Sequence, residues 1–172
     1  MNRPSLLATI GPAGAGKTTW RNRCVPVVAD VVSLDDIRAE LSPCGCSADQ
    51  TVNAAAVEVG TAMTRAALAA GRTVVWDTTA YLSGFRAHLL DLAAEFGARA
   101  VGLLVLPPLD TVLVRNSRRD GTPCPQCGFS RRVPENRVRE MHDAITAALP
   151  SLPTEGWHEL RYLTPQAKEN SR

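Results

Sequence analysis

The sequence lacks any long hydrophobic run. Although 45% of its 172 residues are hydrophobic, no segment approaches the roughly 20 consecutive apolar residues that a membrane-spanning helix needs. This absence excludes a helical membrane protein and indicates a soluble one. The N-terminal MNRPS leads directly into the short apolar segment LLATI, so we expect no cleaved signal peptide and, by default, a cytoplasmic location.

The chain also has little net charge, no internal repeat and no linker-like stretch. Its 19 Lys and Arg residues against 17 Asp and Glu residues give a formal charge of +2, which does not indicate a protein that covers a long nucleic-acid duplex. A chain of this length without a linker fits one folded unit. We therefore expect a single domain over residues 1–165, followed by a disordered tail at residues 166–172.

Short apolar runs alternate with helical patterns along the whole chain. Strands are predicted at residues 6–10, 25–34, 72–77, 98–106 and 157–163. Helices are predicted at residues 17–24, 35–41, 51–70, 85–97, 109–119 and 134–149. Nearly continuous apolar strands that alternate with helices predict an α/β fold, with a parallel sheet of about five strands sandwiched by helices.

The stretch GPAGAGKT at residues 11–18 matches the phosphate-binding pattern G-x-x-x-x-G-K-[ST] in full, between a predicted strand and a predicted helix. Its glycines let backbone N–H groups turn toward phosphates, Lys17 is expected to reach the β- and γ-phosphates, and Thr18 is expected to bind Mg²⁺. The alternative is a glycine-rich turn without a ligand. The predicted nucleotide contacts are Gly11, Ala13, Gly14, Ala15, Gly16, Lys17, Thr18 and Thr19.

Two adjacent acids and an arginine follow the second predicted strand, in the stretch VVSLDDIRAEL. Asp35 and Arg38 are three residues apart, so they share a face of the predicted helix at the strand edge where ligands bind. A carboxylate that accepts a hydroxyl proton, beside an arginine that grips a phosphate, suits phosphorylation of an alcohol on an anionic chain. The alternative is an acidic helix cap with a salt bridge, which we favour for Asp36.

Four stretches follow one another along the chain: IGPAGAGKTTW, SLDDIRAEL, VVWDTTAY, and RNSRRDGT followed by VPENRV. In this order they resemble the 5′-kinase domain of the polynucleotide kinases, which phosphorylate 5′-hydroxyl ends of DNA or RNA. The resemblance runs from Leu6 to about Leu163. It implies ATP and Mg²⁺ as ligands, Asp35 as the general base, and Arg38 as the group that holds the phosphate following the acceptor nucleoside.

The resemblance also implies an arginine-rich lid and a further acid in the site. It places Arg115 and Arg119 on or under a lid at about residues 120–133. The two arginines are four residues apart on one predicted helix, so they share a face. They can stabilise charge on the transferring phosphoryl group, and Arg119 is the first candidate for this role. Asp77 is placed in the wall of the active site, where it orients Mg²⁺ through water or fixes Arg38. Alternatively, Asp77 only caps a helix.

The cysteines offer a candidate zinc site that the familiar polynucleotide kinases do not need. CPQCG contributes Cys124 and Cys127 in the form of a zinc knuckle, and CGC contributes Cys44 and Cys46 at a spacing tighter than usual for zinc. Four cysteine ligands would make a structural site that ties the lid to the loop after the Asp35 helix. A disulfide and free thiols on a flexible lid are the alternatives.

The sequence thus predicts an ATP-dependent polynucleotide 5′-hydroxyl kinase whose partner is a DNA or RNA 5′-OH end. One alternative is a kinase of the same fold for a small alcohol, such as a sugar or an antibiotic. Another is a nucleotide-switched binding module without an acceptor. No phosphatase or ligase signature is present, so in end repair those activities would come from separate partners.

Overall fold

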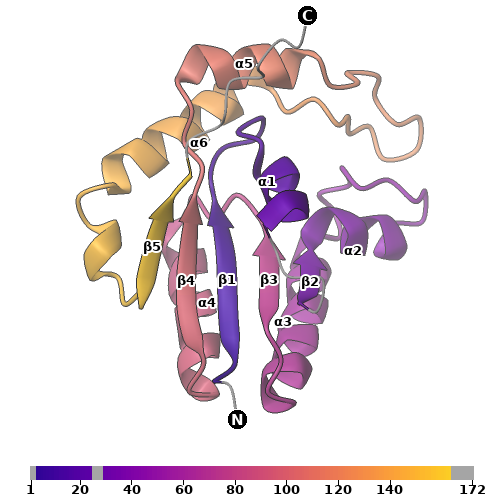
Figure 1. The fold of residues 1–172 in the computed structure, drawn as a ribbon. Coiled ribbons are helices and arrows are strands. Elements are labelled where there is room, and N and C mark those ends of the chain that lie inside the picture. Colours follow the sequence, from indigo (N-terminus) through magenta and orange to yellow (C-terminus); the bar gives the residue numbers. More distant parts are fainter. Residues whose placement is uncertain (1–2, 25–28, 164–172) are drawn as a thin grey trace, which may run out of the picture.

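Five parallel strands form the centre of the computed structural model, which describes residues 3–24 and 29–163 (Figure 1). Within this described part the strand order is β2-β3-β1-β4-β5, and every neighbouring pair is parallel. The predicted parallel sheet of about five strands is therefore confirmed. The strands are β1 (Ser5–Ile10), β2 (Asp30–Ser33), β3 (Val74–Asp77), β4 (Arg99–Leu104) and β5 (Glu159–Tyr162).

Helices flank this sheet, and α5 lies across the carboxyl ends of the strands at the top of Figure 1. In that view α3 and α4 lie behind the strands and α1 lies in front. Among the described helices, none is long and apolar enough to cross a membrane. The helices are α1 (Lys17–Cys24), α2 (Leu34–Leu41), α3 (Asn53–Ala69), α4 (Ser83–Glu95), α5 (Leu109–Ser117) and α6 (Glu135–Ala148), followed by a 3₁₀ turn (Leu152–Thr154).

The observed elements match the predicted ones in type and order, but several ends differ. Within the predicted strand 25–34, residues 25–28 lie outside the described part and β2 covers only four residues. Leu34 was expected in the strand but begins α2, because Ser33 accepts a hydrogen bond from the Asp36 N–H and caps the helix. Pro134 precedes α6 instead of being its first residue. The predicted tail, residues 166–172, lies outside the described residues.

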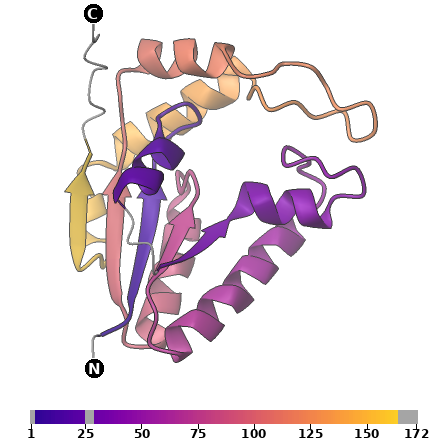
Figure 2. The same cartoon turned by 45° about the vertical axis from the view of Figure 1, so that its right-hand side comes forward.

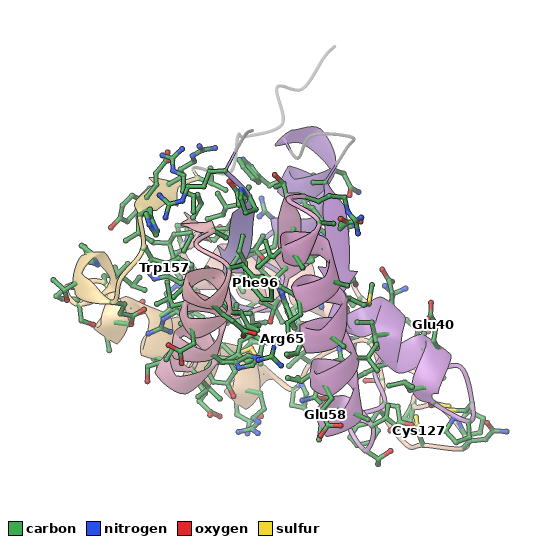
Figure 3. All side chains as sticks on the ribbon, turned by 90° about the horizontal axis from the view of Figure 1, so that it is seen from below. Glu40, Glu58, Arg65, Phe96, Cys127 and Trp157 are labelled. Carbon is green, nitrogen blue, oxygen red and sulfur yellow. The ribbon has the colours of Figure 1, made fainter. Side chains whose placement is uncertain are left out.

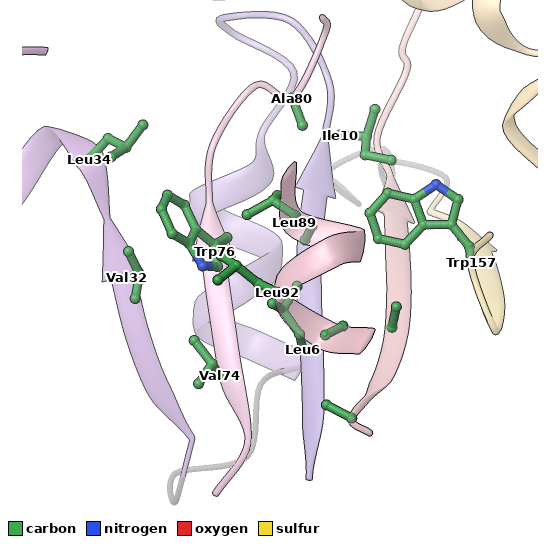
Figure 4. Packing of buried hydrophobic residues seen from close by; sticks show 14 of the residues in the cluster. Leu6, Ile10, Val32, Leu34, Val74, Trp76, Ala80, Leu89, Leu92 and Trp157 are labelled. Carbon is green, nitrogen blue, oxygen red and sulfur yellow. The ribbon is translucent and has the colours of Figure 1, made fainter. Parts of the chain in front are cut away.

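The core is packed around Trp76 of β3, which is fully buried and lies against Gly60 of α3. Figure 4 shows Trp76 among other buried side chains of the core. Its indole N–H donates to Thr64 Oγ1 at 2.8 Å, and the Thr64 hydroxyl donates to the Gly60 carbonyl. A Cβ at Gly60 would lie 2.8 Å from Trp76 and from Val32. The glycine in α3 therefore allows the helix to approach the sheet closely enough to close the core.

A buried arginine connects the loop after β3 to the segment between α6 and β5. Arg86 of α4 is 2% exposed and donates to the carbonyls of Ala80 and Tyr81 at 3.0 and 2.9 Å. It also forms a two-pronged pair with the Glu155 carboxylate at 2.6 and 2.8 Å. Ala80 has a φ of 42°, a left-handed conformation that is strained for a residue with a side chain. Arg86 holds this strained loop beside the phosphate-binding end of the sheet.

Candidate nucleotide and acceptor site

The phosphate loop, residues 11–16, runs from the end of β1 to the start of α1, as the motif predicted. Gly14 has a φ of 88°, and a Cβ there would lie 2.7 Å from the Val112 carbonyl oxygen. A Cβ at Gly11 would lie 2.4 Å from the Val105 carbonyl oxygen, so the neighbouring chain requires glycine at both positions. The loop is anchored by the Gly11 N–H, which donates to the Thr79 carbonyl at 2.9 Å.

The side chain of Lys17 folds back over this loop. Its ammonium group donates to two carbonyls of the loop, those of Gly11 and Pro12, each at 2.9 Å. Burial lowers the pKa of Lys17 to about 8, while the charge of Asp77 opposes the shift. The charges of Arg119 and Asp35 act on the same pKa, downward and upward respectively. Charged groups from β3, α2 and the segment after α5 therefore all influence the pKa of Lys17.

Asp77 ends β3 and faces the first turns of α1. Its Oδ2 atom accepts a 2.9 Å hydrogen bond from Thr18 Oγ1 and forms a 2.9 Å ion pair with Arg21, and its side chain is 8% exposed. Arg38 instead bonds to Ser47, Asn53 and Asp35. The helix that follows Asp77, α4, begins at Ser83 without a side-chain cap. The Thr18 hydroxyl and Asp77 carboxylate are hard oxygen donors, so they fit Mg²⁺.

Two arginines complete a hollow of about 230 Å³ over the phosphate loop. Arg115 donates to the Ala15 carbonyl at 3.1 Å, whereas the side chain of Arg119 is exposed. Because α5 ends at Ser117, Arg119 lies beyond the helix, and the prediction that both arginines share one helix face is wrong. Both nevertheless face the same hollow. Its lining residues are Gly14, Gly16, Lys17, Thr18, Thr19, Arg115 and Arg119.

Asp35 and Arg38 form an ion pair on one face of α2, immediately after β2. The Asp35 side chain is 70% exposed, whereas the Arg38 side chain is only 10% exposed. Arg38 also donates to the Ser47 carbonyl at 2.9 Å and to Asn53 Oδ1 at 2.8 Å. The Arg38 guanidinium group is thus hydrogen-bonded to the α2–α3 loop and the start of α3, and its ion pair fixes the Asp35 carboxylate at the surface of the site.

The α2–α3 loop, residues 42–52, is ordered by a buried acid that the sequence analysis missed. Asp49 is 2% exposed and accepts hydrogen bonds from Ser42 Oγ at 2.7 Å and from the N–H and hydroxyl of Thr51 at 2.9 and 2.6 Å. The Thr51 and Ser42 hydroxyls hold the pKa of Asp49 below its usual value. An Asp two residues before a Thr is typical of an Asx turn, and this signal was present in the sequence.

Arg21, Ser47 and Asn53 were also missed. Arg21 is three residues after Thr18 on α1, a spacing that places both side chains on one face of the helix toward Asp77. No comparable signal points to Ser47 or Asn53, because they reach Arg38 through the path of the α2–α3 loop.

The lid, residues 120–133, follows α5 without a helix or strand of its own, as predicted. Its base is closed by Asn116, which donates to the Val133 carbonyl at 2.7 Å and accepts from the Val133 N–H at 3.2 Å. The guanidinium group of Arg132 donates twice to the Arg119 carbonyl, at 3.1 and 3.0 Å. Figures 1 and 2 show the lid reaching toward the α2–α3 loop on the same side of the molecule.

The tip of the lid meets the α2–α3 loop where Cys124 and Cys127 approach Cys44 (Figure 3, where Cys127 is labelled). We call these three residues and the nearby Cys46 the thiol cluster. The sulfur atoms of Cys44, Cys124 and Cys127 all lie within 4.8 Å of one another. Hydrogen bonds from the backbone of Cys127 and Gln126 lower the pKa of Cys124 to about 7. A backbone hydrogen bond at Phe129 favours the Cys127 thiolate, but burial and the thiols of Cys124, Cys44 and Cys46 outweigh it and raise the Cys127 pKa to about 12.

Comparison with known proteins identifies the fold. A family model described as an AAA domain, AAA_33, matches residues 6–148, and no curated protein matches the chain. A structure of AvrRxo1-ORF1:AvrRxo1-ORF2 with sulphate ions is similar at a TM-score of 0.72 and 18% identity, covering 95% of this chain and 55% of that one. A chain of the Pnkp1/Rnl/Hen1 RNA repair complex is similar at a TM-score of 0.70 and 17% identity, covering 88% and 47%.

A third structure, Chaetomium thermophilum Kti12 in complex with ADP-AlF3, is similar at a TM-score of 0.58 and 17% identity, covering 95% of this chain and 91% of that one. The present chain spans about half the length of the first two proteins. At these identities the likeness concerns the fold, which is of the P-loop kinase type.

Proposed function

Because this chain belongs to the AAA domain family AAA_33, we propose that it is an ATP-dependent phosphotransferase. Specifically, we propose a polynucleotide kinase that transfers the γ-phosphate of ATP to a DNA or RNA 5′-hydroxyl end. The position of Asp35 supports this proposal most directly. Its exposed carboxylate is held by Arg38 and is close enough to Lys17 of the phosphate loop to raise the pKa of that amine. We therefore propose that this proton acceptor faces the region where the terminal phosphate of a bound nucleotide would lie.

The phosphates of ATP would be held by groups that the chain already directs into the hollow. The Lys17 ammonium group and the guanidinium groups of Arg115 and Arg119 supply positive charge, and the N–H groups of the phosphate loop supply donors. Thr18 and Asp77 would hold Mg²⁺, which when bound neutralises charge on the β- and γ-phosphates.

In the proposed reaction the acceptor hydroxyl oxygen attacks the γ-phosphorus in line with the leaving group. A new P–O bond forms to the acceptor, the bond between the γ-phosphorus and the bridging oxygen breaks, and ADP leaves with that electron pair. The hydroxyl proton passes to the Asp35 carboxylate. Arg38 positions this carboxylate by pairing with it, while Arg119 stabilises the charge on the transferring group.

The charge around the site supports a nucleic-acid end as the acceptor. Exposed arginines before and within the lid, Arg118, Arg119 and Arg131, offer contacts to a few phosphates, while the net charge of +2 does not fit a long duplex footprint. An end-directed kinase needs contacts only to the phosphates next to the acceptor nucleoside.

A small alcohol is the second candidate acceptor, and the burial of Arg38 favours it. Three donors of this guanidinium group are used by Ser47, Asn53 and Asp35, which leaves fewer of them for a substrate phosphate. A kinase for an uncharged alcohol needs Asp35 but no phosphate anchor on α2.

Labelling of matched 5′-hydroxyl DNA and RNA oligonucleotides with ATP carrying a radioactive γ-phosphate tests the proposal. We expect transfer to at least one oligonucleotide, and a decrease of about 10²- to 10⁴-fold for Asp35→Asn, because a general base contributes that much. Asp36→Asn is the matched control, because Asp36 is exposed and adjacent to Asp35. The transfer rate of this variant should stay within about threefold of that of the unaltered protein.

Other outcomes separate the alternatives. ATP binding without transfer to either oligonucleotide, but with transfer to a sugar or another small alcohol, would replace the nucleic-acid acceptor. ATP binding without transfer to any alcohol would indicate a nucleotide-switched binding module. Equal activity of Asp35→Asn and the unaltered protein would remove Asp35 from the mechanism.

A further inference from the structure

We propose that the thiol cluster binds one structural zinc ion, which fastens the tip of the lid to the α2–α3 loop. Three sulfur atoms, from Cys44, Cys124 and Cys127, already lie within 4.8 Å of one another. A tetrahedral zinc site with Zn–S bonds of about 2.3 Å separates its sulfur atoms by about 3.8 Å. A small contraction therefore converts this arrangement into three corners of a zinc tetrahedron.

The fourth ligand comes from Cys46. Its thiol lies outside the three-sulfur group, two residues from Cys44 on the same loop. Gly45, between the two cysteines of the α2–α3 loop, has a φ of 68° and open space around its Cα. This left-handed residue turns the chain sharply between Cys44 and Cys46, and in the proposed site the turn would let both thiols reach one ion despite their short spacing.

The lid contributes a preformed turn of the zinc-knuckle type. The Gly128 N–H donates to the Cys124 carbonyl at 2.8 Å, and the Cys124 N–H donates to the Phe129 carbonyl at 2.8 Å. Gly128, with a φ of 76°, closes this turn, so Cys124 and Cys127 come from one tight turn at the tip of the lid.

The chemistry of the donor set selects zinc and assigns it a structural role. Four soft thiolates in tetrahedral geometry favour zinc over the hard cations Mg²⁺ and Ca²⁺, and they leave no open position for a catalytic water. All four thiols are free and partly buried, so burial shields the cluster. A disulfide would use only two of these sulfur atoms and would leave the convergence of the others unexplained.

The proposed zinc ion would link two segments that hold arginines of the site. On one side, the α2–α3 loop binds Arg38 through the Ser47 carbonyl. On the other side, the base of the lid binds Arg119 through the guanidinium group of Arg132. The zinc ion joins these two segments at their tips, opposite the phosphate loop, and so fixes the spacing between the acceptor side and the nucleotide side. This inference does not depend on which acceptor the protein phosphorylates.

Elemental analysis of the full chain purified without chelator tests the site. We expect about one zinc ion per chain, and less than about half an equivalent after dialysis for each of Cys44→Ser, Cys46→Ser, Cys124→Ser and Cys127→Ser. Cys24→Ser is the matched control, since it removes a cysteine and keeps all four proposed ligands, and it should retain one equivalent. A content below about half an equivalent in the unaltered protein would overturn the proposal.

Hydrogen exchange measures the link separately, without requiring any variant to fold. Removal of zinc from the unaltered protein by a strong chelator should speed amide exchange in residues 42–50 and in residues 120–133 together, and added zinc should restore both. Faster exchange in the lid alone would show that the metal does not bridge the two segments. A disulfide between the lid and the α2–α3 loop, found by mass spectrometry of the unreduced chain, would also overturn the zinc assignment.

Discussion

Thr18 and Asp77 are joined by a 2.9 Å hydrogen bond that connects the first turn of α1 to the end of β3. The order of the sheet explains this contact: β3 is the direct parallel neighbour of β1, so its last residue lies beside the loop and helix that follow β1. Arg21 binds the same carboxylate oxygen and holds it in place. The order of the strands therefore brings together two oxygen groups that suit a divalent cation.

Replacing Asp77 by Asn should impair phosphoryl transfer without removing the shape of the side chain. The change takes away the negative charge that faces Thr18, so we expect the rate to fall by at least about 10²-fold and the Mg²⁺ requirement to rise. The measurement is the transfer rate as a function of Mg²⁺ concentration. Asp30→Asn, which breaks an exposed pair with Arg72 on the same sheet, is the control and should change neither quantity.

The affinity for ATP should decrease at alkaline pH because of Lys17. Burial lowers the pKa of this amine to about 8, and only its protonated form attracts the phosphates. The affinity should therefore be nearly constant below pH 8 and weaken by up to about tenfold per pH unit above it. Binding isotherms between pH 6.5 and 9.5 measure this, with Lys17→Arg as the control, since a guanidinium group keeps its charge. An unchanged affinity across this range would contradict the prediction.

Two glycine substitutions should change the free energy of unfolding in opposite directions: Gly14→Ala should lower it and Gly84→Ala should raise it. Gly14→Ala adds a Cβ 2.7 Å from the Val112 carbonyl oxygen at a φ of 88°, so it should lower the free energy of unfolding by at least about 1–3 kcal/mol and abolish ATP binding. Gly84→Ala places its methyl group in open space in α4, where alanine is the better helix former by about 1 kcal/mol, and should leave ATP binding intact. Urea unfolding and nucleotide titration measure both variants.

The interior position of Arg38 predicts a stability effect as well as an activity effect. Arg38→Ala leaves the Ser47 carbonyl and the Asn53 amide oxygen without their donor, so we expect a loss of about 2–4 kcal/mol in the free energy of unfolding. Arg65→Ala, which breaks an exposed pair with Glu95, should cost no more than about 1 kcal/mol. Equal stabilities of the two variants would show that Arg38 does not organise the α2–α3 loop.

Local patterns in the sequence were sufficient for the fold. Apolar strands that alternate with helices predicted the parallel sheet, and the complete GPAGAGKT motif predicted the strand, loop and helix around Lys17. Both depend on residues close together in the chain. The contact between Asp77 and Thr18 could not be predicted in the same way, because it depends on the order in which distant strands pair.

The same limit explains the errors at the arginines. The sequence did not reveal that α5 ends at Ser117, which places Arg119 beyond the helix. The sequence also indicated that Arg38 binds a substrate phosphate, and it did not reveal the hydrogen bonds from this side chain to Ser47 and Asn53. The cysteines are the opposite case: their pattern indicated a metal site, and the path of the lid brings three of the four together.

The connection from Glu155 through Arg86 gives the C-terminal part of the domain an influence on phosphate binding. Arg86 holds the carbonyls of Ala80 and Tyr81, and the preceding residue, Thr79, receives the first N–H group of the phosphate loop. A chain shortened to end before Glu155 would leave a guanidinium group inside the protein without its counter-ion. Loss of this segment would then reach the phosphate loop through the Arg86 side chain and the hydrogen bond from the Gly11 N–H to the Thr79 carbonyl.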